Sequence, residues 1–517
     1  MNMIISKRQY YQLIIILKLR QTKEGQGIKM KIFTKTGNGC NRFRFFASYY
    51  MKDKKSDDRK EREKLMRRKG MERVTAGVLA AVMAVGMTGC ANGGMSGTTT
   101  DLTGKYGNKE DGQTEGTGAN GQTEDAGTED AAMEEKDLGA IREAFEDSYT
   151  QFSLNLLRES RKQVQNGESA KNTMVCPLSV MMALEMTRTG ADGDTKEQMG
   201  EVLYPGMSAE DGSMVLGRIC KSLPDAEGAR FHMSDSVWVK TADDAFVPDE
   251  DFLDTVKTAY DAEVYGAPFD ETTCRDINRL VERETDGMIT EILDQIPERA
   301  VMYLVNAVAF DAEWETPYDE SQIQDATFYA EDGSEQEVSM MYDTTYRYLS
   351  MEHASGFCRA YKEGYDFVAL LPEEGLSLAE WLEELDGETF HETIRQENDT
   401  MIETGLPQFT GETDLELKDT LTALGMPLAF DEKQADFSKM GYCPDGRNIS
   451  ISRVLHKTHI DVDGLGTKAG AATVVEMCKE TAMAEQPKRI ILDRPFLYAI
   501  VEKDTGIPVF IGTVESF

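Results

Sequence analysis

The sequence predicts an α+β protein with largely antiparallel sheets. Helical periodicity dominates the first half of the globular part, and β-branched and aromatic runs dominate the second half. No βαβ order repeats along the chain, so a parallel α/β sheet is not indicated. The 517 residues, of which 40% are hydrophobic, are enough for a large core.

The expected helices show apolar spacing and defined ends. Pro177 begins a helix that runs to Thr189, and Gly190 ends it. Thr195 with Gln198 predicts a capping box for the next helix. An earlier helix carries apolar residues at helical spacing, namely Leu138, Ile141, Phe145, Phe152, Leu156 and Leu157.

The expected strands near the end of the chain are β-branched and aromatic runs. They cover Arg489–Leu492, Phe496–Val501 and Pro508–Val514. The last two are joined by a turn at Asp504–Gly506.

A basic and then apolar segment precedes the globular part. Val74–Met87 is apolar, follows four basic residues between positions 67 and 73, and ends in small residues before Cys90. This order is typical of a secretory signal and is too short to cross a bilayer comfortably. Met87–Cys90 resembles a bacterial lipobox, in which cleavage exposes a cysteine that receives lipid. We therefore expect a signal peptide over 66–90, lipidation at Cys90 and an extracellular protein anchored to the bacterial surface; an uncleaved anchor or a plain signal peptide is the alternative.

The segments on either side of this signal are expected to lack structure. Met1–Leu65 precedes a signal that works only at the start of a translated chain, so it is interpreted as a start-site artefact or a disordered basic segment, with Met66 or Met71 as the start. Residues 91–136 are rich in Gly, Thr, Asp and Glu, which predicts a disordered acidic spacer. The globular domain is expected to span 137–517.

Charge and composition exclude several classes of function. The first 73 residues carry a net charge of +14, so the remainder carries −50. Such a surface repels anionic polymers, and neither nucleic acid nor heparin is expected as a partner. The eight cysteines include no CxxC pair and the five histidines no HExxH motif. His456 and His459 are interpreted as strand residues, so no metal or other cofactor is expected.

Four stretches resemble the serpin family and occur in the family's order. They are Asn172–Leu203, the VNAVAFDAEW motif within Asn278–Trp314, His456–Thr473 and Ile490–Ile500. Two stretches between them, LPQFTGETDLELKDTLTALGM and ADFSKM, are similar in register. On these motifs the globular part is identified as a member of the family.

This resemblance implies a serpin fold, with helices around three mainly antiparallel sheets and an exposed reactive-centre loop. It also implies a suicide-substrate mechanism. A target serine protease cleaves the loop, the cut loop inserts into the main sheet as a new strand, and the acyl-linked protease is distorted before it can hydrolyse the ester. The chain is therefore expected to be a monomeric inhibitor that forms a covalent acyl complex with its target, and not an enzyme.

The resemblance also assigns roles to individual residues. Ser179, Asn306 and His456 match the polar shutter, which lets the main sheet open, and Trp314 matches the tryptophan of the breach, where insertion starts. The hinge of the loop is matched by Gly466, Thr467, Lys468, Ala469, Gly470, Ala471, Ala472 and Thr473.

Two residues depart from the family pattern. Cys176 replaces the usual serine before Pro177, so one shutter hydrogen bond is expected to be weaker. Gly464 replaces the usual acidic residue at the base of the loop, so a hinge contact is expected to be absent.

The loop sequence itself fits an inserting strand. Successive side chains of a strand alternate between its two faces. One of the two faces holds both charges, Lys468 and Glu476. The other face is uncharged and reads Thr467, Ala469, Ala471, Thr473, Val475 and Met477. Glycines such as Gly464 and Gly466 suit a hinge better than an ordinary strand.

The scissile bond is placed within Cys478–Ala484. The family spacing counted forward from Gly466 ends at Glu480–Thr481, and counted back from Pro495 it ends near Ala484–Glu485. Lys479 would suit a trypsin-like enzyme and Glu480 a glutamate-specific one. The small uncharged residues outnumber them and favour an elastase- or subtilisin-like target. The candidate residues of the bond are Glu480, Thr481, Ala482 and Met483.

Three other interpretations remain. A non-inhibitory serpin-fold surface binding protein, cleaved as a plain substrate, is favoured by Gly464 and opposed by the loop alternation. An enzyme is opposed by the absence of GxSxG and of a partner for Cys478. A phosphate loop at GLGTKAG has the wrong glycine spacing, and Asp461 and Asp463 would repel phosphate.

Overall fold

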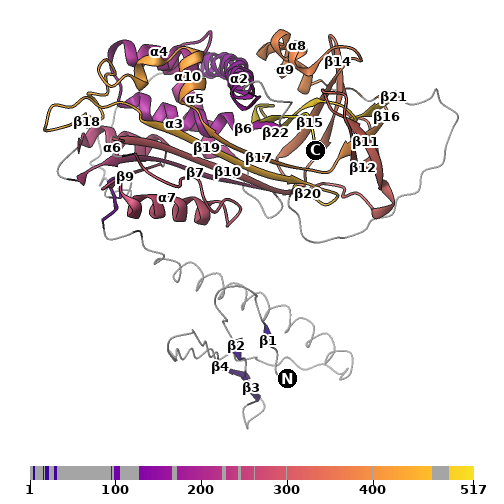
Figure 1. Ribbon diagram of the computed structural model, residues 1–517, viewed down its shortest axis with the longest axis horizontal. Helices are drawn as coiled ribbons and strands as arrows, with labels where there is room; N and C mark the ends of the chain where they lie inside the picture. Colours follow the sequence, from indigo (N-terminus) through magenta and orange to yellow (C-terminus); the bar gives the residue numbers. More distant parts are fainter. Residues whose placement is uncertain are drawn as a thin grey trace. The chain divides into compact units, whose positions relative to one another are not determined.

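The computed structural model divides the chain into two compact units, Met1–Gly93 and Gly94–Phe517, which are described separately (Figure 1). Side chains are described from position 95 onward, except at 127–137 and 221. The described residues are 4–5, 15–16, 18–21, 28–31, 95, 98–104, 127–165, 172–223, 229–242, 246–260, 262–297, 300–396, 398, 400–467 and 488–517.

The first unit contains two short antiparallel strand pairs. β1 (Ile4–Ile5) pairs with β2 (Ile15–Ile16), and β3 (Lys18–Gln21) pairs with β4 (Ile28–Lys31). The signal peptide expected over 66–90 lies outside the described residues, as does its Cys90. Both this segment and the interpretation of Met1–Leu65 stay predictions.

The second unit is built on three large sheets, as expected. The main sheet has the strand order β17 (Phe409–Glu416), β19 (Arg453–Val462), β20 (Gly466–Thr467), β10 (Met302–Glu313), β7 (Ala229–Lys240), β9 (Glu263–Ala267) and β5 (Thr100–Asp101). A four-stranded sheet has the order β11 (Ile323–Tyr329), β12 (Glu335–Thr345), β16 (Ile402–Pro407) and β21 (Lys488–Ile491). A six-stranded sheet has the order β13 (Tyr348–Met351), β14 (Ala354–Ala360), β15 (Tyr365–Pro372), β22 (Phe496–Glu502), β23 (Pro508–Val514) and β6 (Thr173–Val175). A small pair joins β18 (Gly441–Tyr442) to β8 (Val247–Pro248).

Helices cover both faces of the main sheet (Figure 1). The α-helices are α2 (Gly127–Gln165), α3 (Pro177–Thr189), α4 (Gly193–Leu203), α5 (Ala209–Ser222), α6 (Glu250–Tyr260), α7 (Glu271–Glu284), α8 (Leu378–Glu384), α9 (Gly387–Ile394) and α10 (Lys418–Leu424). Among the elements whose residues are all described, the 3₁₀ turns are η2 (Glu320–Gln322) and η3 (Pro427–Phe430). α3 packs on one face of β10 and β7, whereas α7 packs on the other face of β7.

The central strand β10 divides the core by period-two alternation. Its even-numbered apolar residues, such as Leu304 and Val308, belong to the large cluster on the α3 face. Its odd-numbered residues Tyr303, Val305 and Ala307 belong to a smaller cluster with α7. Asn306 is a buried amide on the otherwise apolar even-numbered face, and it therefore needs polar partners there.

Most of the element predictions are confirmed. α3 begins at Pro177 and ends at Thr189, with Gly190 as its C-cap, and the last strands match the three expected runs within one residue. The capping box at Thr195 is wrong, because α4 begins at Gly193 with Asp192 as its N-cap. The Thr195 hydroxyl instead accepts a hydrogen bond from the backbone of Asp436.

The prediction of a disordered spacer over 91–136 is wrong for two parts of that segment. Residues 127–136 belong to α2, and Thr100–Asp101 form β5, which pairs antiparallel with β9. The segment around β5 has almost no apolar residue of its own. It is ordered because its backbone extends a sheet that already exists, which needs no separate core.

Candidate functional site

The candidate site is the seam between β10 and β19 in the main sheet. The two strands pair in parallel from Tyr303 and Arg453 to Ala309 and His459. Beyond that stretch they separate, and β20 lies between them. Thr467 pairs antiparallel with Ala312 on β10 and with Val462 on β19. The seam is therefore closed at one end and holds the start of the loop at the other (Figure 1).

Hydrogen bonds from both side chains and backbone hold the turn that leads from β19 into β20. The Trp314 indole donates to the Asp463 carbonyl over 2.8 Å, and the Trp314 amide donates to the Leu465 carbonyl over 3.0 Å. The Asp463 carboxylate accepts from the amides of Leu465 and Gly466. The base of the hinge is thus fixed to the end of β10.

The first hinge side chain points into the protein. Thr467 is fully buried, and its hydroxyl oxygen lies 2.7 Å from the Tyr361 hydroxyl. The Tyr361 ring stacks on Trp314, with centroids 4.4 Å apart and an interplanar angle of 9°. Burial raises the pKa of Tyr361, so it stays a neutral hydroxyl that can donate to Thr467. We call Trp314, Tyr361 and Thr467 the breach cluster.

Two glycines at the hinge fit the space they occupy. A Cβ at Gly466 would lie 2.1 Å from the Ala312 carbonyl oxygen, so only glycine allows β20 this close to β10. The Gly464 carbonyl accepts from the Tyr318 amide over 2.8 Å, and a Cβ at Gly464 would lie 2.9 Å from the end of Ile323. Position 464, where glycine replaces the acidic residue usual in the family, is therefore held by a backbone hydrogen bond to Tyr318 and packed closely against Ile323.

A polar cluster crosses the closed end of the seam. The Asn306 side chain donates to Ser179 at the start of α3, and its carbonyl oxygen accepts from His456 Nδ1. His456 Nε2 in turn accepts from the Cys176 amide over 3.1 Å, which places the ring proton on Nδ1. Burial lowers the pKa of His456 to about 3, so the ring is neutral.

Asp235 on β7 is a member of this cluster that the sequence reasoning missed. It lies opposite Asn306 in the β7–β10 ladder, and its Oδ1 accepts from Asn306 over 2.7 Å and from Ser179 over 2.5 Å. Its Oδ2 is buried without a hydrogen-bond partner among the described residues. Burial raises the pKa of Asp235 to about 8. We call Ser179, Asp235, Asn306 and His456 the shutter cluster.

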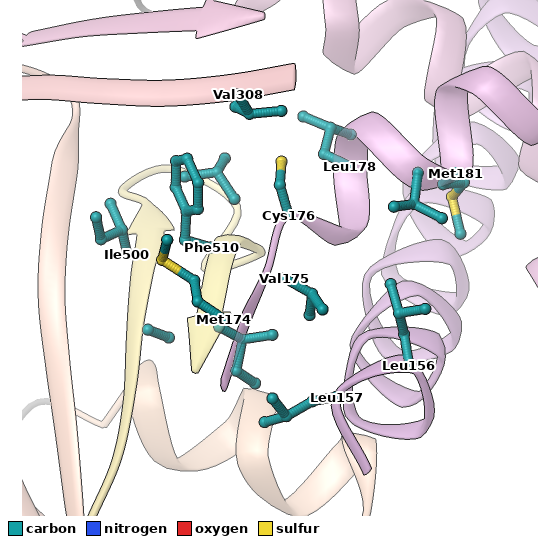
Figure 2. Close-up of a cluster of buried hydrophobic side chains, with 14 of the residues drawn as sticks. Leu156, Leu157, Met174, Val175, Cys176, Leu178, Met181, Val308, Ile500 and Phe510 are labelled. Carbon is teal, nitrogen blue, oxygen red and sulfur yellow. The ribbon is translucent and has the colours of Figure 1, made fainter. Parts of the chain in front are cut away.

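Cys176 takes part in this cluster through its backbone. Figure 2 shows its side chain among apolar groups, with Leu178, Val308 and Phe510 around it. Burial raises the pKa of its thiol, and the cysteine is free. The contact between position 176 and His456 is a hydrogen bond from the backbone amide. Because it does not use the side chain, this bond can form with cysteine as well as with serine at position 176.

The predicted site residues that the structure describes lie in two places, and the others lie outside the described residues. Ser179, Asn306 and His456 meet in the shutter cluster. Trp314 lies in the breach cluster with Thr467. Five residues of β10 lie between Asn306 and Ala312, the partner of Thr467, so the two places are roughly 20 Å apart along the strand. Hinge residues 468–473 and the candidate reactive bond, Glu480, Thr481, Ala482 and Met483, lie outside the described residues.

The described residues contain no group of three or more His, Cys, Asp or Glu side chains arranged to hold a metal ion. Among the same residues, no helix combines the length and hydrophobicity that crossing a membrane requires.

Comparison with protein families identifies the chain. The family model "Serpin (serine protease inhibitor)" matches residues 147–517, most of the second unit. The chain belongs to the serpin family. Serpin-ZXA of Oryza sativa subsp. japonica is 31% identical over 368 residues, which cover 68% of this chain and 91% of that protein. Human Serpin B7 is 30% identical, over 71% of this chain and 97% of its own length.

Solved serpin structures share the fold. The thermophilic serpin tengpin in its native state has a TM-score of 0.69 and 36% identity, and the match covers 81% of this chain and 100% of that one. Tengpin in its latent state has a TM-score of 0.62 and 39% identity, over 72% and 98% of the two chains. These relatives support protease inhibition as the general function.

Proposed function

We propose that the chain inhibits serine proteases as a suicide substrate whose cut loop inserts between β10 and β19. One observation carries this proposal: β20, the first residues of the loop, is antiparallel to both of its neighbours. If the loop continues in the same direction, one parallel ladder is exchanged for two antiparallel ladders. The inserted form therefore contains more strand pairing than the uncut form.

The register of β20 indicates how far the loop reaches. Because Thr467 pairs with Ala312, a continued antiparallel strand pairs residue 477 with Met302, the first residue of β10. Residues 468–477 thus fill the seam, and a bond within 478–484 lies just beyond its far end. A cut there releases the whole inserting stretch and leaves the acylated residue at the opposite end of the sheet.

The same register determines which side chains are buried. Thr467 is inward, so alternation places Ala469, Ala471, Thr473, Val475 and Met477 on the same face. All of these side chains are uncharged, and those nearest the hinge are small. The face can enter the core without burying a charge, which would be costly.

The energy of insertion is large enough to drive the process. On the order of ten new backbone hydrogen bonds contribute about 0.5–1.5 kcal/mol each. Their sum, about 5–15 kcal/mol, is comparable to the stability of a typical domain. The uncut form is then metastable and persists because a kinetic barrier separates it from the inserted form.

For the target, we propose an elastase- or subtilisin-like serine protease that forms a covalent acyl complex with a monomeric inhibitor. The small residues Thr481, Ala482 and Met483 suit such pockets, and the net charge of −50 beyond residue 73 steers basic enzymes toward the inhibitor. A panel of serine proteases tests this, with mass spectrometry of the acyl complex and the released peptide. Cleavage without a denaturant-stable complex would instead support the non-inhibitory alternative.

We also propose that Cys90 carries lipid and holds the inhibitor at the outer surface of a bacterial cell. The support is the order of basic, apolar and small residues before this cysteine. Two acyl chains anchor a protein stably, whereas one does not. Cys90→Ala should abolish membrane association and lipid-dependent processing. Unchanged fractionation of this variant would contradict the proposal.

A further inference from the structure

The two edges of the main sheet differ in how they are protected. A bare edge strand offers unpaired backbone groups to another chain, and charged side chains are one common defence. The edge strand β17 has exposed Thr410, Glu412 and Asp414 along it. β9, at the other side, reads Glu-Val-Tyr-Gly-Ala and is uncharged after Glu263. β9 therefore lacks the charges that defend β17.

Residues 98–104 cover the β9 edge. Thr100 and Asp101 pair with Gly266 and Tyr265, and the Leu102 amide donates to the Val264 carbonyl over 2.8 Å. The Val264 amide donates back to the Thr103 hydroxyl over 3.4 Å. The outward backbone groups of β9 are thus satisfied by a distant earlier segment, in which Thr103 lies 161 residues before Val264.

Side-chain contacts fix this segment on α7 as well. The Thr99 hydroxyl donates to the buried Asp276 carboxylate over 2.7 Å, and the Thr98 and Thr272 hydroxyls lie 3.3 Å apart. Leu102 packs on the large core cluster, and Met95 packs on the smaller cluster that includes α7. The contacts join three separate parts of the unit: the β9 edge, α7 and the core.

The covering segment lies outside the residues that the family model matches, which begin at 147. It occupies the edge of a sheet whose remaining strands all come from the family domain. The sheet can therefore form without it, but with β9 as a bare edge.

We propose that residues 98–104 are a built-in guard strand that keeps a second copy of this chain from pairing with β9. A bare β9 suits a second copy because an edge strand can pair with itself across a two-fold axis. In an antiparallel pair centred on Tyr265, Glu263 of one copy faces Ala267 of the other. No like charges are then opposed, and the pair is otherwise apolar.

The test compares Leu102→Pro with wild type in the full chain, both in the Cys90→Ala background. Proline at 102 removes the amide that donates to Val264. Thr99→Val, which loses the hydroxyl bonded to Asp276, is a milder second variant. Thr99→Ser keeps that hydroxyl and is the matched control. Sedimentation velocity over a hundredfold concentration range measures self-association, and hydrogen exchange measures protection of the Val264 amide.

The guard-strand account predicts that Leu102→Pro dimerises at concentrations at least tenfold lower than wild type. Thr99→Val should give a smaller change in the same direction, and Thr99→Ser none. The Val264 amide should exchange faster in the variant monomer and be protected again in the dimer. Excess synthetic peptide of residues 95–104 should suppress the dimer, whereas the peptide with Leu102→Pro should not.

Three results would overturn the proposal. The first is a Leu102→Pro variant that exchanges Val264 faster yet keeps the wild-type mass at every concentration. The second is unchanged Val264 exchange in both Leu102→Pro and Thr99→Val. The third is a dimer in which Val264 stays unprotected, because association then occurs elsewhere. None of these readouts involves a protease, so they are independent of the proposed inhibitory function.

Discussion

The two ends of the β10–β19 seam are held by different kinds of interaction. At the breach, Trp314 stacks on Tyr361, and the Tyr361 hydroxyl contacts Thr467, the hinge residue that already lies between the strands. At the shutter, the strands pair directly, and buried polar side chains bridge them to α3 and β7. The contacts of the breach hold Thr467 in place between the two strands. The shutter hydrogen bond from His456 on β19 to Asn306 on β10 instead joins the two strands directly and must break before they separate.

If the sheet opens for insertion as proposed, this difference favours opening that begins at the breach. In the proposed insertion, a strand that enters at the breach finds its first pair already made and reaches the shutter cluster at residue 473, which the register places opposite Asn306. The buried polar groups there cost about 1–3 kcal/mol each when left without partners. Under the proposed mechanism, the shutter would contribute to the barrier to insertion, and insertion would begin at the breach.

Thr467→Arg should have the largest effect, because it blocks the breach. The arginine would place an unpaired charge where a buried threonine contacts Tyr361, at a cost of several kcal/mol. Each 1.4 kcal/mol slows insertion about tenfold, while hydrolysis of the acyl-enzyme continues. The variant should be cleaved as a substrate and form no denaturant-stable complex on a gel.

Thr467→Ser is the matched control, since it keeps the hydroxyl and should still trap the protease. Efficient trapping by Thr467→Arg would show that inhibition does not need this side chain to enter the sheet.

Asp235→Asn should make the shutter insensitive to pH. In the folded protein the pKa of Asp235 is raised to about 8, whereas in the unfolded chain it is about 4. Between these pH values the folded protein therefore binds a proton that the unfolded chain has lost. The stability from this group is therefore complete below about pH 4 and is lost as the pH rises to about 8, by up to about 1.4 kcal/mol per unit. Melting temperatures of the uncut protein at pH 5 to 8 measure this.

The difference in melting temperature between Asp235→Asn and wild type should grow in favour of the variant as the pH rises. The exposed Asp325→Asn on β11 is the control and should track wild type. A difference that is constant from pH 5 to pH 8 would mean that Asp235 does not titrate in this range.

Tyr361→Phe should have the smallest effect. It removes the hydroxyl that contacts Thr467 and keeps the ring stacked on Trp314. A hydrogen bond of about 0.5–1.5 kcal/mol corresponds to a change in insertion rate of up to about tenfold. The number of inhibitor molecules consumed per trapped protease should rise severalfold. A value equal to wild type would show that the stack alone positions the hinge.

The sequence was sufficient where a feature depends on neighbouring residues. Pro177 and Gly190 locate α3 because helix ends follow local chemistry, and the last strands follow from their β-branched runs. The shutter residues on α3, β10 and β19 came from motifs, and the structure brings them together.

Features that depend on distant partners could not be predicted. Asp235 joins the shutter because of the β7–β10 register, and Tyr361 reaches Thr467 from another sheet. The local sequence predicted Thr195 as a helix cap, but its hydroxyl accepts a hydrogen bond from the backbone amide of Asp436, which is distant in the sequence. The composition of residues 98–104 predicted a spacer, because their ordered strand depends on pairing with the distant β9 and not on their own side chains. An acidic residue inside the MSDSVW run was the one available signal for Asp235.

The most direct test is the melting temperature of the protein before and after one cut within Cys478–Ala484. Insertion adds on the order of ten ladder bonds, so the cut protein should melt about 10 °C or more above the uncut protein. A nick in an ordinary exposed loop leaves stability equal or lower. A cut protein that melts at or below the intact one would contradict loop insertion and, with it, the proposed mechanism of inhibition.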